Sequence, residues 1–258
     1  MRGPFSAQFD AVSYQKTIGN SAYNAFELSL RHQSKSLEIV AGYTYSKSLD
    51  DSSSLAEEAN PAGPGLTRAL SAFDMRHNFV VNYKYDLPFD RLNHRGRLWA
   101  TGWSLSGVTR FGTGLPVTLY NNNDTSLLGT MPNGINNNGL DTPEVAPGSL
   151  KIDMNPREGN PVFNRALFTL PPLGQLGNTR RRYFYGPGID NFDTALQKNV
   201  RLTEAKSLLF RMEVFNTFNH AQFFGPASVD GDISSASFGQ IVNAASPRLV
   251  QVVAKFVF

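Results

Sequence analysis

The chain has 258 residues, of which 41% are hydrophobic and 17% are charged, and its formal net charge is +3. This composition excludes an intrinsically disordered chain, and the basic residues are spread along the chain instead of forming the concentrated patch that nucleic-acid binding requires. Cysteine is absent, which excludes disulfides, thiolate metal ligands and thiol nucleophiles.

The first ten residues, MRGPFSAQFD, have neither an apolar core nor a small-residue cleavage site, so no secretory signal peptide is recognisable there. We therefore expect that the protein is not exported or that its true N-terminus is missing. No apolar run of about 18 residues occurs anywhere, which excludes a transmembrane helix. A membrane β-barrel remains compatible with the mean hydropathy of -0.27, because only every second residue of its strands is apolar.

Apolar and polar residues alternate with a period of two in one segment after another, which predicts β-strands. In residues 22–33, for example, Phe26 and Leu28 alternate with Glu27 and Ser29. The other clear segments are residues 37–46, 78–87, 99–110, 192–201, 208–214 and 249–258. With a weaker segment at residues 5–16, they predict about eight antiparallel strands in an all-β fold. The polar face of these strands would carry Glu27, Arg31, Asn82, Lys84, Arg211 and Glu213.

Short and long connections alternate between the predicted strands. The short ones cover residues 33–36, 88–96 and 203–205, and the long ones cover residues 48–75, 121–188 and 218–246. Outer-membrane barrels have short periplasmic turns and long extracellular loops, so this alternation places the C-terminus on the periplasmic side. The link at residues 18–21 breaks the pattern, because it is short but would be extracellular.

The long connections are predicted to be solvated turns. Residues 121–188 contain two asparagine runs and many prolines, a composition that favours turns and that we expect to build no core. Asp50, Asp51, Glu57 and Glu58 lack the spacing of a calcium-binding EF-hand, so we expect a solvated acidic loop there.

The sequence contains no convincing cluster of reactive groups. The four histidines, His32, His77, His94 and His220, lie far apart and lack the spacing of a metal site. The glycines at residues 112–114 and 185–188 are not followed by a helix signal, so they predict bends and no phosphate-binding loop. We therefore expect no catalytic residue, no metal and no cofactor, and a protein that is not an enzyme.

One local run combines positive charge with aromatic rings. It consists of Arg180, Arg181 and Arg182 followed by Tyr183, Phe184 and Tyr185. Guanidinium groups beside aromatic rings suit anionic or planar ligands, so Arg180, Arg181, Arg182, Tyr183 and Tyr185 are candidate ligand contacts. The alternative is a basic loop near lipopolysaccharide phosphates, or a rim of the barrel.

Residues 191–224, NFDTALQKNVRLTEAKSLLFRMEVFNTFNHAQFF, resemble the region near the C-terminus of TonB-dependent outer-membrane receptors of the Oar-like type. Upstream segments such as DMRHNFVVNYKYDLPF resemble the same family, and the likeness extends from about residue 21 to the end. The resemblance implies a barrel of 22 strands in contact with outer-membrane lipid, located in a cell outer membrane of Gram-negative type. It also implies uptake of an unidentified solute with energy from TonB. The final aromatic, Phe258, with Phe256 next on its face, would be the signal for the barrel-assembly machinery.

The chain departs from that family at its start, where neither a plug domain nor a TonB box is recognisable. About eight strands also cannot close a barrel of the implied size. We therefore expect residues 1–258 to be the C-terminal part of a receptor barrel, a single incomplete domain whose partners would be the missing plug and N-terminal barrel part, and TonB. Two alternatives remain open. One is a complete eight-stranded outer-membrane barrel with a structural or adhesive role, and the other is a soluble carbohydrate-binding or hydrolytic β-sandwich.

Overall fold

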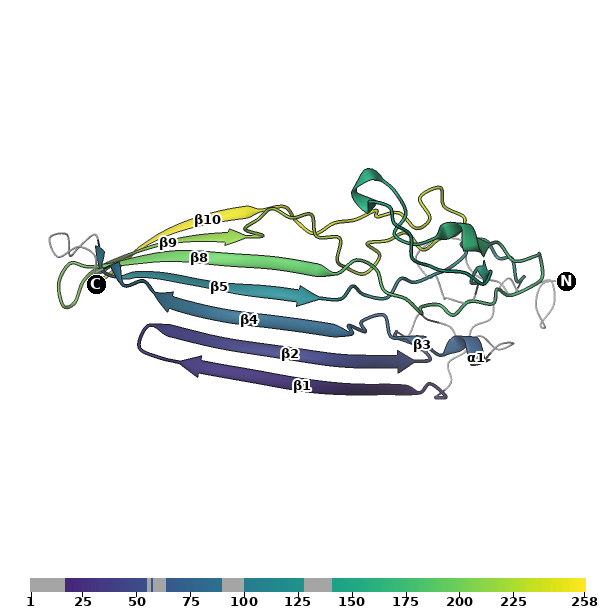
Figure 1. The fold of residues 1–258 in the computed structure, drawn as a ribbon, viewed down its shortest axis with the longest axis horizontal. Coiled ribbons are helices and arrows are strands. Elements are labelled where there is room, and N and C mark those ends of the chain that lie inside the picture. Colours follow the sequence, from purple (N-terminus) through teal and green to yellow (C-terminus); the bar gives the residue numbers. More distant parts are fainter. Residues whose placement is uncertain (1–16, 55–56, 58–63, 90–99, 128–140) are drawn as a thin grey trace.

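The computed structural model describes residues 17–54, 57, 64–89, 100–127 and 141–258. Seven long strands form one antiparallel sheet in the order β1, β2, β4, β5, β8, β9, β10 (Figure 1). Their bounds are β1 Ser21–Gln33, β2 Leu37–Asp50, β4 His77–Asp86, β5 Trp103–Gly112, β8 Ile189–Arg201, β9 Ser207–Phe215 and β10 Leu249–Val257.

These seven strands confirm the seven clear segments of period-two alternation. The weaker segment at residues 5–16 lies outside the described residues. β5 begins at Trp103, later than the predicted residue 99, and the reason is Gly102, whose φ of 78° interrupts the extended chain. A Cβ at Gly102 would lie 2.2 Å from the carbonyl oxygen of Asn199, so only glycine fits where this strand begins.

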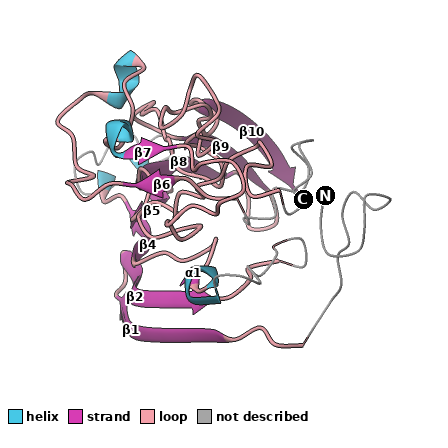
Figure 2. Cartoon of the chain, turned by 90° about the vertical axis from the view of Figure 1, so that its right-hand side faces the viewer, coloured by secondary structure: helices cyan, strands magenta, loops and turns pink. Residues whose placement is uncertain are grey.

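The strands are joined alternately by short and long connections, as predicted. The long connections gather at one end of the sheet, and the C-terminus lies at the other end with the short turns (Figure 1). The sheet is curved but open, and in the described part of the chain β1 and β10 are edge strands with one neighbour each (Figure 2). The backbone groups along these two outer edges therefore have no ladder partner among the described residues.

The register separates the side chains into an apolar face and a polar face. Residues directly opposite each other point to the same side of a sheet, and Leu28 pairs with Tyr43, Tyr43 with Phe79 and Phe79 with Phe111. The apolar face that these residues share is largely uncovered, and Leu28 is 59% exposed. The polar residues predicted to share a face do so, since the same register places all six on the other side of the sheet.

In their described parts, the long connections contain only short regular elements. These are α1 Pro64–Thr67, β3 Ala69–Leu70, β6 Glu144–Val145, the 3-10 turns Pro156–Glu158 and Arg165–Leu167, and β7 Phe168–Thr169. β3 pairs with the end of β2, and β6 pairs with β7. We call the described residues of the three long connections (51–54, 57, 64–76, 113–127, 141–188 and 216–248) the loop cap.

The prediction that residues 121–188 build no core is wrong. The loop cap contains a cluster of buried apolar side chains formed by Val117, Leu119, Phe163, Phe168, Val229 and Phe238. The ring of Phe163 makes edge-to-face contacts with Phe168, Phe184 and Phe238, and the ring centroids are 4.9 to 5.4 Å apart. Each segment supplies only a few apolar residues, so the composition of a single segment does not predict a core. The core forms where the segments after β5 and after β9 pack together.

Candidate functional site

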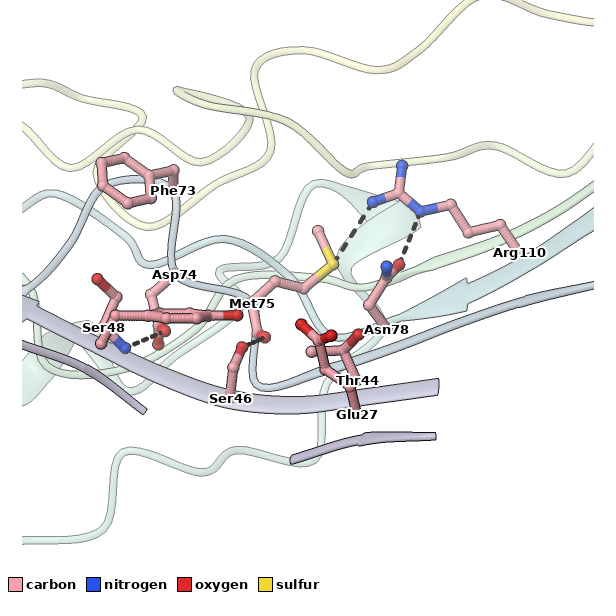
Figure 3. Close-up of a pocket in the computed structure, with 10 residues that line it drawn as sticks. Glu27, Thr44, Ser46, Ser48, Phe73, Asp74, Met75, Asn78 and Arg110 are labelled. Atoms are coloured by element: carbon pink, nitrogen blue, oxygen red, sulfur yellow. Dashed lines mark hydrogen bonds between the residues drawn. The ribbon is translucent and has the colours of Figure 1, made fainter. Parts of the chain in front are cut away.

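A pocket of about 350 Å³ opens on the polar face of the sheet, at the end where the loop cap begins (Figure 3). Four neighbouring strands, β1, β2, β4 and β5, supply its wall, and residues 73–75 of the β3–β4 connection cover one side. The pocket therefore lies between the four strands and a segment of the loop cap.

The register of the sheet places the polar side chains of the pocket in one row. Glu27 of β1 lies opposite Thr44 of β2, and Thr44 lies opposite Asn78 of β4. Arg110 of β5 continues the row, because its Nε donates a hydrogen bond of 3.0 Å to Oδ1 of Asn78. Period-two alternation alone places these four side chains on one face, and the strand order then brings them together.

Asp74 anchors the covering segment to the wall. It is 2% exposed, its Oδ1 accepts a hydrogen bond of 2.6 Å from the backbone N–H of Ser48, and its Oδ2 accepts one of 2.5 Å from the hydroxyl of Tyr185. The hydroxyl of Ser46 donates to the carbonyl of Met75 at 2.9 Å. Asp74 therefore connects the end of β2, the β3–β4 connection and the segment before β8.

Tyr185, one of the candidate ligand contacts, belongs to this anchor. Burial, followed by the hydrogen bond and negative charge of Asp74, raises the pKa of its hydroxyl to about 12. The guanidinium carbon of Arg76 lies 4.9 Å from the centre of the Tyr185 ring. The phenol thus stays protonated and continues to donate to Asp74 across the neutral range of pH.

Arg181 and Arg182 occupy a second cluster, which we call the arginine clamp. Their side chains are 2% and 1% exposed, and both guanidinium groups bind the carboxylate of Glu57. Oδ1 of Asp50 lies 3.7 Å from Nη2 of Arg181 and 3.9 Å from Nη2 of Arg182, and the hydroxyl of Ser53 accepts a hydrogen bond of 2.9 Å from Arg182. Backbone carbonyls accept the further hydrogen bonds, those of Asp51 and Thr67 from Arg181 and that of Leu70 from Arg182.

The arginine clamp overturns the prediction of a solvated acidic loop at Asp50 and Glu57, and Glu58 lies outside the described residues. Asp50 is 3% exposed, and the side chain of Glu57 is 14% exposed. Burial opposes the charge of Glu57, but hydrogen bonds from Arg182 and the backbone of Ser53, with the positive charges of both arginines, lower the pKa of its carboxyl. Sequence reasoning missed this because Glu57 and Arg182 lie 125 residues apart.

The remaining residues of the basic and aromatic run differ in their surroundings. Arg180 is exposed, whereas Tyr183 is half-buried against the apolar cluster of the loop cap. Burial raises the pKa of the Tyr183 hydroxyl to about 12. The structure therefore separates the run: Arg181 and Arg182 bind acceptors of this chain, Tyr185 anchors Asp74, and ligand contact by any of them stays a prediction.

The C-terminal residues lie at the opposite end of the sheet from the pocket. Phe258 is 89% exposed and stacks on Phe256 with ring centroids 5.8 Å apart. Phe256 is also exposed, and the C-terminus lies at the end of the sheet away from the loop cap (Figure 1). Their recognition by the barrel-assembly machinery stays a prediction.

Within the described ranges, no three acidic or histidine side chains come close enough together to hold a metal ion. In the same part of the chain, no helix is long and apolar enough to cross a bilayer. Of the side chains that line the pocket, sequence reasoning had identified Glu27 as a polar-face residue. It missed Phe73, Asp74 and Met75, because a residue of a long connection has no periodicity to show where it lies.

Comparison with known proteins gave one result. A family model described as "Outer membrane beta barrel domain" matches residues 1–251. No curated protein and no solved structure matches the chain.

Proposed function

Because this chain belongs to the outer membrane beta barrel domain family, and is therefore located in the cell outer membrane, we propose that it forms part of the wall of a TonB-dependent receptor. In this proposal the apolar face contacts lipid, and the polar face lines the path of a solute. The loop cap lies on the extracellular side and the Phe258 end on the periplasmic side. The complete receptor takes up the solute with energy supplied through TonB, and this chain performs no covalent chemistry.

The observation that carries the proposal is a two-faced sheet whose outer edges are far from each other. β1 and β10 lie at opposite sides of the seven-stranded path, and neither has a second neighbour among the described residues. Open edges are unfavourable in lipid, because each unpaired backbone group costs several kcal/mol there. Further strands between β10 and β1 would satisfy these groups, and the 22-stranded barrel of the receptor family would supply them.

The pairing of the free edge of β10 distinguishes the proposal from the alternative of a complete small barrel with a structural or adhesive role. A barrel closed by eight strands requires the predicted strand at residues 5–16 to pair with β10, whereas in the larger barrel other strands pair with β10. A disulfide requires Cα atoms closer than about 7 Å, and the chain has no cysteine of its own to interfere.

The first experiment tests this with pairs of cysteines in outer membranes that contain the protein. Phe9→Cys in the predicted strand at residues 5–16 is combined in turn with Val250→Cys, Val252→Cys and Ala254→Cys on β10, and the control pair is Leu28→Cys with Tyr43→Cys, which are direct neighbours. We expect an oxidant to join the control pair and none of the others. A disulfide between position 9 and β10 would contradict the receptor proposal and support the small barrel.

The second experiment tests uptake. The natural gene is expressed in an outer-membrane host with and without TonB, and solutes accumulated from the medium are compared by mass spectrometry. We expect at least one solute to accumulate only when both the protein and TonB are present. Equal accumulation without TonB would overturn the energised step.

A further inference from the structure

The charged side chains that line the pocket are Glu27, Arg110 and Asp74 (Figure 3). Asp74 is 2% exposed and already accepts hydrogen bonds from Ser48 and Tyr185, which leaves Glu27 and Arg110 as the accessible charges. The carboxylate of Glu27 belongs to β1 and the guanidinium of Arg110 belongs to β5, which are separated by β2 and β4. Neighbouring strands lie roughly 4.8 Å apart, so the two backbones are about 14 Å apart along the row. Thr44 and Asn78 occupy the interval.

Both charged groups have unused capacity for hydrogen bonds. In the described part of the chain, Glu27 makes neither an ion pair nor a side-chain hydrogen bond. Nε of Arg110 donates to Asn78, Nη2 lies 3.5 Å from the sulfur of Met75, and Nη1 has no acceptor among the described residues. The pocket can therefore accept a cation at one end and an anion at the other.

Elsewhere on the polar face, six charged side chains form ion pairs. These pairs are Arg211 with Glu213 at 2.8 Å, Arg31 with Glu38 at 3.8 Å, and Lys84 with Asp86 at 3.8 Å. Glu27 and Arg110 differ from these six side chains, because neither has an oppositely charged partner in the described part of the chain.

Two aromatic rings provide apolar surface at the same place. Tyr23 of β1 and Phe73 of the covering segment line the pocket and are 61% and 65% exposed. Exposed rings beside hydrogen-bonding groups can bury the apolar part of a ligand whose ends are polar.

We propose that this pocket binds a short zwitterionic peptide, with its ammonium group at Glu27 and its carboxylate at Arg110. This inference rests on the proposed function, in which the polar face lines the path of the solute. A dipeptide or tripeptide spans at most about 3.5 Å per residue, which suits the interval left when both side chains lean inward. The amide of Asn78 and the hydroxyl of Thr44 bind the peptide backbone, and Phe73 and Tyr23 contact its side chain.

Other classes of solute fit the charges less well. A neutral sugar would leave both charges without a counter-charge while displacing their water, which is unfavourable. A simple anion would meet Arg110 but also the carboxylate of Glu27. Only a ligand with both charges neutralises both ends.

The experiment measures binding of defined peptides to the purified full chain in detergent by isothermal titration calorimetry. The probes are Gly-Phe-Gly, the same peptide with an acetylated N-terminus, the same peptide with an amidated C-terminus, and maltotriose. Since a hydrogen bond to a charged group contributes about 1.5 to 3 kcal/mol, we expect each blocked terminus to weaken binding by at least about tenfold. We expect maltotriose to bind more weakly than the unmodified peptide.

Two substitutions assign each end of the peptide. Glu27→Gln should weaken binding of Gly-Phe-Gly about tenfold and should not change the affinity for the acetylated peptide. Arg110→Gln should also weaken binding of Gly-Phe-Gly about tenfold, and it should not change the affinity for the amidated peptide. Lys84→Gln is the matched control, because Lys84 lies on the same face in an exposed pair with Asp86 and does not line the pocket. It should change no affinity.

Equal affinity for all three peptides, or tighter binding of maltotriose, would overturn the proposed ligand class. The blocked peptides test the unmodified protein, so the result does not depend on whether a variant folds. Binding in detergent also requires no TonB. A negative result here therefore leaves the receptor proposal intact, and failure of the uptake experiment leaves the ligand class intact.

Discussion

The sheet of seven long strands, which we call the strand wall, differs from the loop cap in how its apolar side chains are covered. Along the wall, large apolar side chains such as Phe26 and Val252 remain 60% and 72% exposed, and in the proposed function lipid covers them. In the loop cap, Phe163 is 2% exposed and is covered by other side chains of this chain. The wall thus depends on its surroundings, whereas the loop cap carries its own core.

The comparison also concerns charge. The polar face of the wall carries three exposed or half-exposed ion pairs, whereas the loop cap encloses the arginine clamp. Exposed pairs contribute little, but removing one partner of a buried pair leaves an uncompensated charge. Substitutions should therefore affect the two regions through different mechanisms.

The largest effect should come from removing the central ring of the loop cap. Phe163→Ala should destabilise the loop cap by about 3 to 5 kcal/mol, because it leaves a cavity among Phe168, Phe184 and Phe238. Limited proteolysis in lipid should show faster cleavage of the long connections, with circular dichroism of the strands unchanged. Phe26→Ala is the control, and equal proteolysis of both variants would show that the loop cap does not depend on its core.

The next effect should appear in the wall and should depend on which face is changed. Leu28→Arg places a charge on the apolar face in the middle of β1 and should reduce stability in a bilayer by about 2 to 4 kcal/mol. Ser29→Arg, one residue along and on the polar face, should cost less than about 1 kcal/mol. Urea unfolding in lipid vesicles measures both, and similar losses would contradict the assignment of the two faces.

A smaller effect is expected at the arginine clamp. Glu57→Gln should destabilise the loop cap by about 2 kcal/mol, less than for a fully buried pair because the Glu57 side chain keeps 14% exposure. Proteolysis of the long connections measures the loss. Glu38→Gln, in an exposed pair with Arg31, is the control and should have no measurable effect.

The same carboxyl predicts how the loop cap responds to acid. Because folding lowers the pKa of Glu57, its stabilisation is complete above the ordinary value of 4.5 and is lost as the pH falls through the folded pKa. Opening of the loop cap by proteolysis should therefore increase below about pH 4.5 in the unmodified protein. The Glu57→Gln variant should show a flatter acid profile, and an identical profile would show that another group is responsible.

The sequence by itself determined the strands, their two faces and the alternation of short and long connections. These follow from local rules, because neighbouring residues of a strand point to opposite sides whatever the rest of the chain does. The resemblance around residues 191–224 added the receptor family as a hypothesis. The family model that matches residues 1–251 establishes the broader family of outer-membrane barrels.

Only the tertiary structure decided what the long connections do. The aromatic core of the loop cap, the contact of Glu57 with Arg181 and Arg182, and the covering of the pocket by Phe73 all join segments that are distant in the chain. Sequence periodicity does not predict such contacts, because each segment supplies only one or two of the contacting residues. Their burial and pairing arise when the sheet brings the ends of its strands, and thus the connections between them, to one place.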